Sequence, residues 1–552
     1  MLRSRRAPPL LLAAALCLTL LAGCAGREAD GMSLSVCVGE SPITFDPIYA
    51  STVGDQTILV HLYENLMRLT VDIAGEPTVT YGMAKSVDQE ENHDGTVTYT
   101  FRLRSARWSD GRAVRAGDFV YAWRRLADPN SSSENARLLS VVAGYDEARA
   151  SGNMELLQVS AKNDSTLVVT LKGRYDWFLQ EVCTAPATMP LRQDVVQKLK
   201  TAAEKKQDAR WWSDPTALVT NGAYQATGYE AGASLTAAAN GRYYGSHTGP
   251  RELTFYFAAA ASSAQALYDA KAVDAIWPLP EEQIGALLAE GETGIPTLGT
   301  YAVLFNCRHE LLADPRVRQA LHLAIDRNAL AAAAGPAAQA ASGLVPPGVP
   351  EDGERDFRTA GGALLDNDPE AYPDRCVHAR EVLAEAGYDS GVSGVGELEY
   401  LYLDQGTNGA VAQELCRMWQ EVLHVKVTPR GVTAKALWSA ARSGEYDMAG
   451  IALTSLCNDA EGFLTSWTSD SPENFTGYGN SAFDTLMSIV IPAEGTARLG
   501  CLHDAESLLL SDDALAPLYT TVTDWRLRET LTGACRDARG WFTFASVTAR
   551  PS

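Results

Sequence analysis

The alternation of apolar and polar residues predicts two β-strands in the N-terminal part of the chain. Residues 96–103 read Thr-Val-Thr-Tyr-Thr-Phe-Arg-Leu, and residues 166–171 read Thr-Leu-Val-Val-Thr-Leu. Successive side chains of a strand point to opposite faces, so a period of two places the apolar residues on one face. Both segments are therefore predicted to be half-buried strands.

A helical period predicts three helices in the C-terminal half. Within residues 315–325, Val317, Leu321 and Ala324 share one face, as expected for an amphipathic helix. Asp314 precedes this segment as a candidate N-cap, and a proline occupies the first helical position. The same spacing occurs in residues 410–423 and 496–510. Strands and helices are thus mixed along the chain, which indicates an α/β fold.

The first residues have the layout of a secretion signal. Three arginines precede an apolar run over residues 10–22, which is shorter than the roughly 20 residues that a membrane-spanning helix needs. The run ends in Leu-Ala-Gly-Cys, which resembles the lipobox of bacterial lipoproteins. This resemblance implies a signal peptide over residues 1–23, a lipidated Cys24, a tether over 24–32 and an extracytoplasmic protein anchored to the cell membrane. The alternative is an ordinary cleaved signal with a chance cysteine.

The net charge bears on the possible binding partners, and the cysteines bear on possible disulfides. The 552 residues carry a formal net charge of −22, which repels phosphate backbones and argues against nucleic-acid binding. Of ten cysteines, Cys17 lies in the signal peptide and Cys24 is the expected lipidation site, which leaves eight in the body. An even number in an exported protein permits disulfides, but isolated buried thiols are an equal alternative.

Motifs for catalysis or metal binding are missing from the sequence. It contains no His-Glu-x-x-His, Gly-x-Ser-x-Gly or Cys-x-x-Cys pattern, and no Gly-Lys pair that would close a phosphate loop. His61 and Glu64 could share a helix face, but no third ligand lies near them in the sequence. We therefore expect a binding protein without catalytic residues, metal or cofactor. A surface-tethered hydrolase with a dispersed site is the alternative from another class.

Several short motifs resemble those of one known family. Residues 108–123 read Trp-Ser-Asp-Gly-Arg-Ala-Val-Arg-Ala-Gly-Asp-Phe-Val-Tyr-Ala-Trp, which looks like the signature of the family 5 extracellular solute-binding proteins. Further matching motifs lie, in the family's order, at residues 45–47, 220–224, 240–244, 314–327, 444–447 and 540–544. Trp108 and Trp123 are expected to be buried scaffold, and Asp118 is expected to cap the helix that carries Trp123.

The resemblance implies a fold and a function for this chain. Members of this family are receptors of oligopeptide and dipeptide ABC importers, with two α/β lobes of the periplasmic-binding-protein type, mixed sheets and a ligand enclosed on closure. By analogy, lobe I spans residues 33–298 with an extra subdomain at about 64–190, lobe II spans 299–519, and residues 520–552 return to lobe I. The expected protein is a monomeric lipoprotein that captures peptides and delivers them to a membrane permease.

Ligand contacts carried over from the family fall in both lobes. Family receptors pair the peptide backbone as an added strand, which here falls at Ser51, Thr52 and Val53, with Asn135 as a further first-lobe contact. The second-lobe contacts fall at Leu453, Ser455, Leu456, Asn458 and Asp459.

The second-lobe segment departs from the family pattern. Peptide receptors commonly show Trp-x-x-Asp-Tyr-x-Asp-Pro-x-x-Phe, whose first Asp meets the free amino terminus of the peptide. Here Leu456 stands at that place, and only Asp459 and Phe463 match. Losing such a charge-assisted bond removes about 1.5 to 3 kcal/mol of ammonium recognition unless Asp459 replaces it. The alternative ligand is therefore a solute without a free ammonium, such as a blocked or cyclic peptide, a sugar or a metal chelate.

Overall fold

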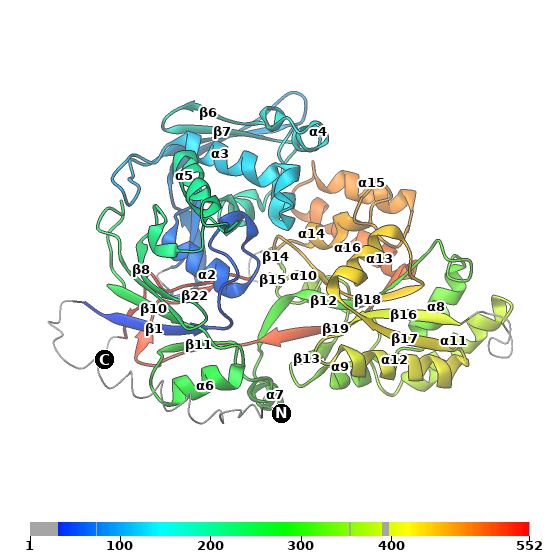
Figure 1. Ribbon diagram of the computed structural model, residues 1–552. Coiled ribbons are helices and arrows are strands. Elements are labelled where there is room, and N and C mark those ends of the chain that lie inside the picture. The colour runs from blue at the N-terminus through cyan, green and yellow to red at the C-terminus, as the bar shows by residue number, and fades with distance from the viewer. Residues whose placement is uncertain (1–30, 73, 353–354, 389–396, 551–552) are drawn as a thin grey trace, which may run out of the picture.

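The computed structural model describes residues 31–72, 74–352, 355–388 and 397–550, so the leader and Cys24 lie outside the described residues. Two six-stranded sheets lie side by side and define the first and the second lobe (Figure 1). The first sheet has the order β20 (Arg526–Leu527), β11 (Ala275–Trp277), β1 (Ser33–Val38), β10 (Glu252–Tyr256), β9 (Ser234–Ala239) and β8 (Tyr224–Glu230). The second has the order β13 (Ala338–Ala340), β19 (Leu515–Thr523), β12 (Ile295–Phe305), β18 (Met448–Thr454), β16 (Leu398–Leu403) and β17 (Val427–Val432).

Both sheets are mixed, which confirms the expected fold class. In the first sheet β1 pairs in parallel with β10 and β11, whereas β9 runs antiparallel to β10. In the second sheet β12 is antiparallel to β18 and β19, and β16 is parallel to β17 and β18. The period of two on β12 places Val303 and Phe305 in one core and Ala302 and Leu304 in another. The second sheet is therefore covered on both faces.

A four-stranded sheet forms a subdomain that shares the core of the first lobe. Its order is β4 (Ala84–Glu91), β5 (Val97–Leu103), β7 (Thr166–Leu171) and β6 (Val159–Asn163). The two strands predicted from alternation are β5 and β7, and they pair antiparallel with Phe101 opposite Leu167. Both of these side chains are buried in the same cluster as Leu34 and Phe255 of the first sheet.

The signature motif contributes scaffold to this subdomain. Trp108 is buried and its Nε1 donates to Asp118 Oδ2 at 3.1 Å, while Trp123 Nε1 donates to the Thr188 carbonyl at 2.9 Å. The expected N-cap role of Asp118 is wrong, because the helix α3 (Ala116–Ala127) begins two residues earlier. Asp118 instead lies in the first turn and accepts the Arg115 N–H at 2.9 Å, which is the carboxylate half of a capping box.

The helices predicted in the second lobe are present. They are α8 (Pro315–Leu323), α12 (Asn408–Leu423) and α16 (Gly495–Ser511). Asp314 caps α8 by accepting the Arg316 N–H at 2.9 Å, as predicted.

Within the part of the chain that the structure describes, no helix is long and apolar enough to cross a membrane. The eight described cysteines are all free thiols, so no disulfide joins the described residues.

The chain passes between the lobes along β12 and β19 (Figure 1). These strands pair antiparallel from Ile295 opposite Thr523 onward, but the register shifts between Pro296 and Thr300. The irregular stretch 297–299 lies where the two sheets meet, so the crossing strands bend at the site described next.

Candidate functional site

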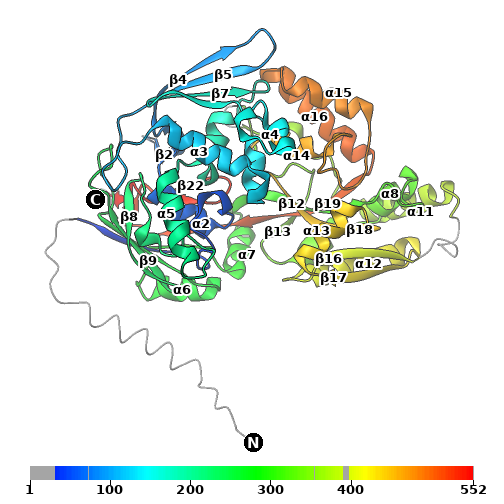
Figure 2. The same ribbon diagram turned by 45° about the horizontal axis from the view of Figure 1, so that its top comes forward.

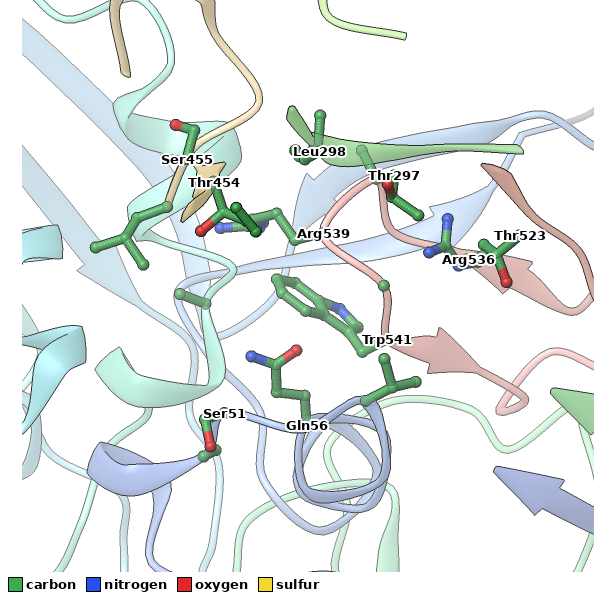
Figure 3. A pocket seen from close by; sticks show the side chains of 18 of the residues that line it. Ser51, Gln56, Thr297, Leu298, Thr454, Ser455, Thr523, Arg536, Arg539 and Trp541 are labelled. Carbon is green, nitrogen blue, oxygen red and sulfur yellow. The ribbon is translucent and has the colours of Figure 1, made fainter. Parts of the chain in front are cut away.

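A cavity of about 640 Å³ lies between the two lobes (Figure 3). The first lobe contributes residues 185–187 together with Ala50, Ser51, Val53 and Gln56, and the C-terminal segment contributes Arg536 and residues 538–541. The second lobe contributes parts of β12, β18 and β19 together with Ser455 and Leu456. This volume falls within the range of about 300 to 1,000 Å³ that is usual for small-ligand pockets.

Trp541 forms one wall and is itself buried. Figure 3 shows its ring in the middle of the view, above the start of α2 (Val53–Leu62) that carries Gln56. The preceding Gly540 has φ 122°, and a Cβ there would lie 3.0 Å from Val53 Cγ2. A glycine is therefore needed both for the backbone conformation and for the close approach of the C-terminal turn to α2.

Arg539 is a lining residue whose charge is fully compensated. Its Nε lies 3.0 Å from Asp537 Oδ1 and 3.0 Å from Glu181 Oε2, and its Nη2 donates to Thr184 Oγ1 at 2.8 Å. Its guanidinium carbon also lies 4.2 Å from the centre of the Trp541 ring. Burial raises the pKa of Glu181, and the Arg539 charge opposes this shift. This network fixes the position of the Trp541 wall.

The segment 51–53 begins a helix rather than an extended strand. The Ser51 and Thr52 amides lie 3.4 and 3.3 Å from Asp55 Oδ2, and Thr52 caps α2 in return. Asn135 Nδ2 donates to the carbonyl of Ala50 at 2.9 Å and so supports this segment. Two of the amides expected to pair with a ligand are thus already bonded to a side chain.

The structure brings five of the predicted contact residues to the cavity, and ligand contact by any of them stays a prediction. The residues that line it are Ser51, Val53, Asn135, Ser455 and Leu456. The predicted residues outside the lining are Thr52, Leu453, Asn458 and Asp459.

Leu456 stands at the junction between the lobes. It lines the cavity and also packs against the core of the first lobe. Asp459, three residues on, caps α14 (Ala460–Leu464) and accepts from Arg498 Nη2 at 2.7 Å. This carboxylate is therefore committed to a cation of the protein.

The charge of the cavity wall is positive. Among the described residues that line it, none is Asp or Glu, and the charged ones are Arg536 and Arg539. No sequence motif assigned these two arginines, or the lining residues Gln56, Trp277 and Trp541, to the site. The motif at residues 540–544 indicates the family, but its sequence does not show which of its residues line a cavity.

Side-chain contacts join the lobes around the cavity. Trp177 Nε1 donates to Glu461 Oε2 at 3.1 Å, and Arg137 Nη1 lies 2.6 Å from Glu473 Oε1. Arg174, just after β7, forms an ion pair with Glu494 at the start of α16, where Figure 2 shows the subdomain close to the second lobe. The described conformation is thus one in which the lobes touch.

The described residues contain no group of three or more His, Cys, Asp or Glu side chains that could hold a metal ion. His61 is buried, its Nε2 accepts the Phe544 N–H at 2.9 Å, and its Nδ1 lies 2.6 Å from the Thr57 carbonyl. Because Nε2 accepts, Nδ1 must carry the proton and donate to that carbonyl. His61 therefore ties α2 to the C-terminal segment.

Comparisons with known proteins agree with this architecture. The sequence model of "Bacterial extracellular solute-binding proteins, family 5 Middle" matches residues 78–475. The periplasmic oligopeptide-binding protein OppA of Salmonella typhimurium is 29% identical over 506 residues, which cover 89% of this chain and 87% of that protein. The probable deoxycholate-binding periplasmic protein YgiS of Escherichia coli is 28% identical over 493 residues, covering 87% and 86%.

A solved structure extends the likeness to three dimensions. Haemophilus influenzae OppA in complex with RPPGFSPFR superposes with a TM-score of 0.72 at 25% identity, covering 95% of this chain and 100% of that chain. Relatives of this kind are binding proteins rather than enzymes. The two-lobed arrangement seen here is thus that of periplasmic peptide-binding proteins.

Proposed function

Because the chain belongs to the bacterial extracellular solute-binding proteins of family 5, we propose that it captures peptides between its two lobes and delivers them to an ABC permease in the membrane. The observation that carries this proposal is the cavity of about 640 Å³ at the junction, lined from both lobes. A ligand in contact with both walls stabilises the closed arrangement, and a permease can recognise that arrangement.

The domain boundaries proposed for this function follow the sheets and cores. Lobe I is residues 33–298, with its subdomain at about 64–190, and residues 520–552 return to it; lobe II is residues 299–519. In support, one core joins buried residues between 34 and 275 with Phe542, Phe544 and Val547. Two other cores contain only residues between 301 and 519.

The proposed location is the outer face of the cell membrane, with the chain held by lipid on Cys24. The proposal rests on the Leu-Ala-Gly-Cys end of the leader. Two acyl chains on one residue give stable anchoring, whereas a single chain gives only marginal binding. A tethered receptor stays near its permease, which suits delivery.

Native mass spectrometry tests the capture of peptides. The mature chain is incubated with a pool of tri- to pentapeptides, and bound masses are read before and after release. We expect intact peptides to bind and to be recovered uncut; hydrolysed peptides would instead support the tethered hydrolase, and no bound peptide would contradict the proposal.

A matched pair of variants localises the binding to the cavity. Thr454 is exposed and lines the cavity, so Thr454→Trp is expected to fill part of it and to reduce binding without disturbing a core. Thr485 is equally exposed on α15 (Ser481–Val490), and Thr485→Trp is expected to bind like the unmodified chain. Equal loss in both variants would place the bound peptides elsewhere.

A second candidate function is the capture of a solute without a free ammonium. It is favoured by Leu456 at the expected ammonium site and by the commitment of Asp459 to Arg498. The YgiS relative, a probable deoxycholate-binding protein, points in the same direction. An unpaired peptide amino terminus beside Leu456 would lose hydration without gaining a partner.

A further inference from the structure

Arg536 differs from its neighbour Arg539 in that its Nε has no hydrogen-bond partner among the described residues. Both side chains line the cavity, and Arg539 is bonded to Glu181, Asp537 and Thr184. By contrast, the Arg536 Nε is buried without a hydrogen-bond partner among the described residues. A buried donor left unpaired costs free energy, so this arrangement calls for an explanation.

Two acidic groups that act on the Arg536 charge, Asp537 and Asp524, form hydrogen bonds to other groups. Asp537 binds Arg539, with Oδ1 3.0 Å from its Nε, and also accepts the Arg539 N–H at 2.8 Å. Asp524 Oδ1 accepts the Trp525 N–H at 2.7 Å. Burial lowers the pKa of Arg536, while Asp537 and Asp524 oppose the shift. These carboxylates help to keep the guanidinium charged without forming hydrogen bonds to it.

Arg536 is one of the residues that line the cavity. Figure 3 draws Arg536 and Thr523 at one side of the pocket and Ser51 and Ser455 at the other, with Trp541 between them. Arg536 also lies against the Phe542 ring, with its guanidinium carbon 6.0 Å from the ring centre, which limits its movement. No acidic side chain lines the described cavity, so nothing in the wall neutralises this charge.

We propose that Arg536 binds an anionic group of the ligand, so that the cavity selects solutes with a carboxylate and does not require a free ammonium. The inference rests on the proposed capture of a solute in this cavity. The planar fork of a guanidinium matches the two oxygens of a carboxylate, and a charge-assisted pair is about twice as strong as a neutral hydrogen bond. The carboxylate can belong to the end of a peptide or to another organic acid.

Four forms of one peptide test the inference. The tetrapeptide Ala-Phe-Ala-Phe is prepared with both ends free, with the amino end acetylated, with the carboxyl end amidated, and with both ends blocked, and each form is titrated by calorimetry. We expect amidation to weaken binding by on the order of 10-fold to 100-fold, and acetylation to leave binding unchanged or stronger. Dependence on the amino end alone would overturn the inference while leaving peptide capture intact.

Variants assign the carboxylate dependence to Arg536. Arg536→Gln is expected to bind the free-acid forms as weakly as the amides, and Arg536→Lys to retain part of the difference, because a lysine keeps the charge but not the fork. The control is Arg102→Gln, since Arg102 is exposed on β5, away from the cavity lining, and pairs there with Asp88. If Arg536→Gln weakens acids and amides equally, the residue is structural and the inference fails.

A second probe separates the two sources of a carboxylate. Deoxycholate, a carboxylate without an ammonium, is titrated against the unmodified chain and against Arg536→Gln. One outcome is that deoxycholate binds, that no form of the peptide binds, and that Arg536→Gln weakens the binding of deoxycholate. This outcome supports the Arg536 site and contradicts peptide capture. Binding of deoxycholate that Arg536→Gln does not change overturns the inference, and binding of none of the five compounds contradicts both proposals.

Discussion

Trp177 and Glu461 offer the sharpest test of how the lobes are held together. The Trp177 Nε1–H donates to Glu461 Oε2 at 3.1 Å, and the same oxygen lies 2.9 Å from Arg498 Nη2. Glu461 is buried, and burial raises its pKa while Arg498 and Trp177 oppose the shift. Trp177→Phe removes the indole donor and keeps an aromatic ring beside Tyr175, whose ring centre lies 5.6 Å away.

The magnitude follows from the kind of bond that is lost. A hydrogen bond to a charged group contributes about 1.5 to 3 kcal/mol, and the lower end applies here because Trp177 is only half-buried and Arg498 remains. The bond joins the two lobes, so its loss acts on the closed form alone. A change of about 1.5 kcal/mol shifts the ratio of closed to open molecules roughly 10-fold and weakens the apparent ligand affinity by up to the same factor.

Calorimetric titration with a bound ligand, such as the tetrapeptide or deoxycholate, measures this change. The control is Trp438→Phe on α13 (Ala434–Ser443), because the Trp438 ring contacts Phe475 and Arg442, all within the second lobe. We expect about 10-fold weaker binding in Trp177→Phe and unchanged binding in the control. Equal affinities in Trp177→Phe and the unmodified chain would refute the claim that this bond holds the lobes together.

Three further predictions concern the anchor, the pH dependence and the ligand end. Expressed with its leader in a bacterial host, the chain should partition with membranes and incorporate radioactive palmitate, and Cys24→Ala should do neither; equal labelling would remove the anchor. Burial lowers the pKa of His61 from 6.5 to about 4, so its contribution to stability is complete above pH 6.5 and is lost as the pH falls toward 4. Denaturant unfolding should show a slope of up to about 1.4 kcal/mol per pH unit from this group, and the same slope in His61→Gln would contradict the assignment. Leu456→Asp should shift the calorimetric preference toward peptides with a free amino terminus, and an unchanged preference would exclude Leu456 from the ligand-end site.

Local periodicity was enough to predict the elements that depend on nearby residues. Strand β5, strand β7 and helix α8 each show their period within a dozen residues, and the Asp314 cap needs only the next two residues. The segment 51–53 shows where a local signal was overlooked. Thr52 and Asp55 form the Thr-x-x-Asp pattern of a capping box, which indicates a helix start rather than an extended strand.

The cavity wall could not be predicted in the same way, because its parts are far apart in the sequence. Val53 meets Gly540 across almost the whole chain, and Glu181 meets Arg539 from within the subdomain. A period shows which face of an element is apolar but not which distant element covers it. Whether Arg536 has a hydrogen-bond partner depends on the positions of the Asp537 and Asp524 oxygens in the fold, and a sequence pattern does not show those positions.

Small-angle scattering shows whether the chain captures a solute by closing its two lobes. The chain is stripped of ligand by partial unfolding and refolding, and its radius of gyration is compared with that of the same sample saturated with a ligand identified by calorimetry. We expect a smaller radius of gyration in the saturated sample, because the contacts of Trp177 and Arg137 with the second lobe form only when the lobes meet. An unchanged radius at confirmed saturation would contradict capture by closure.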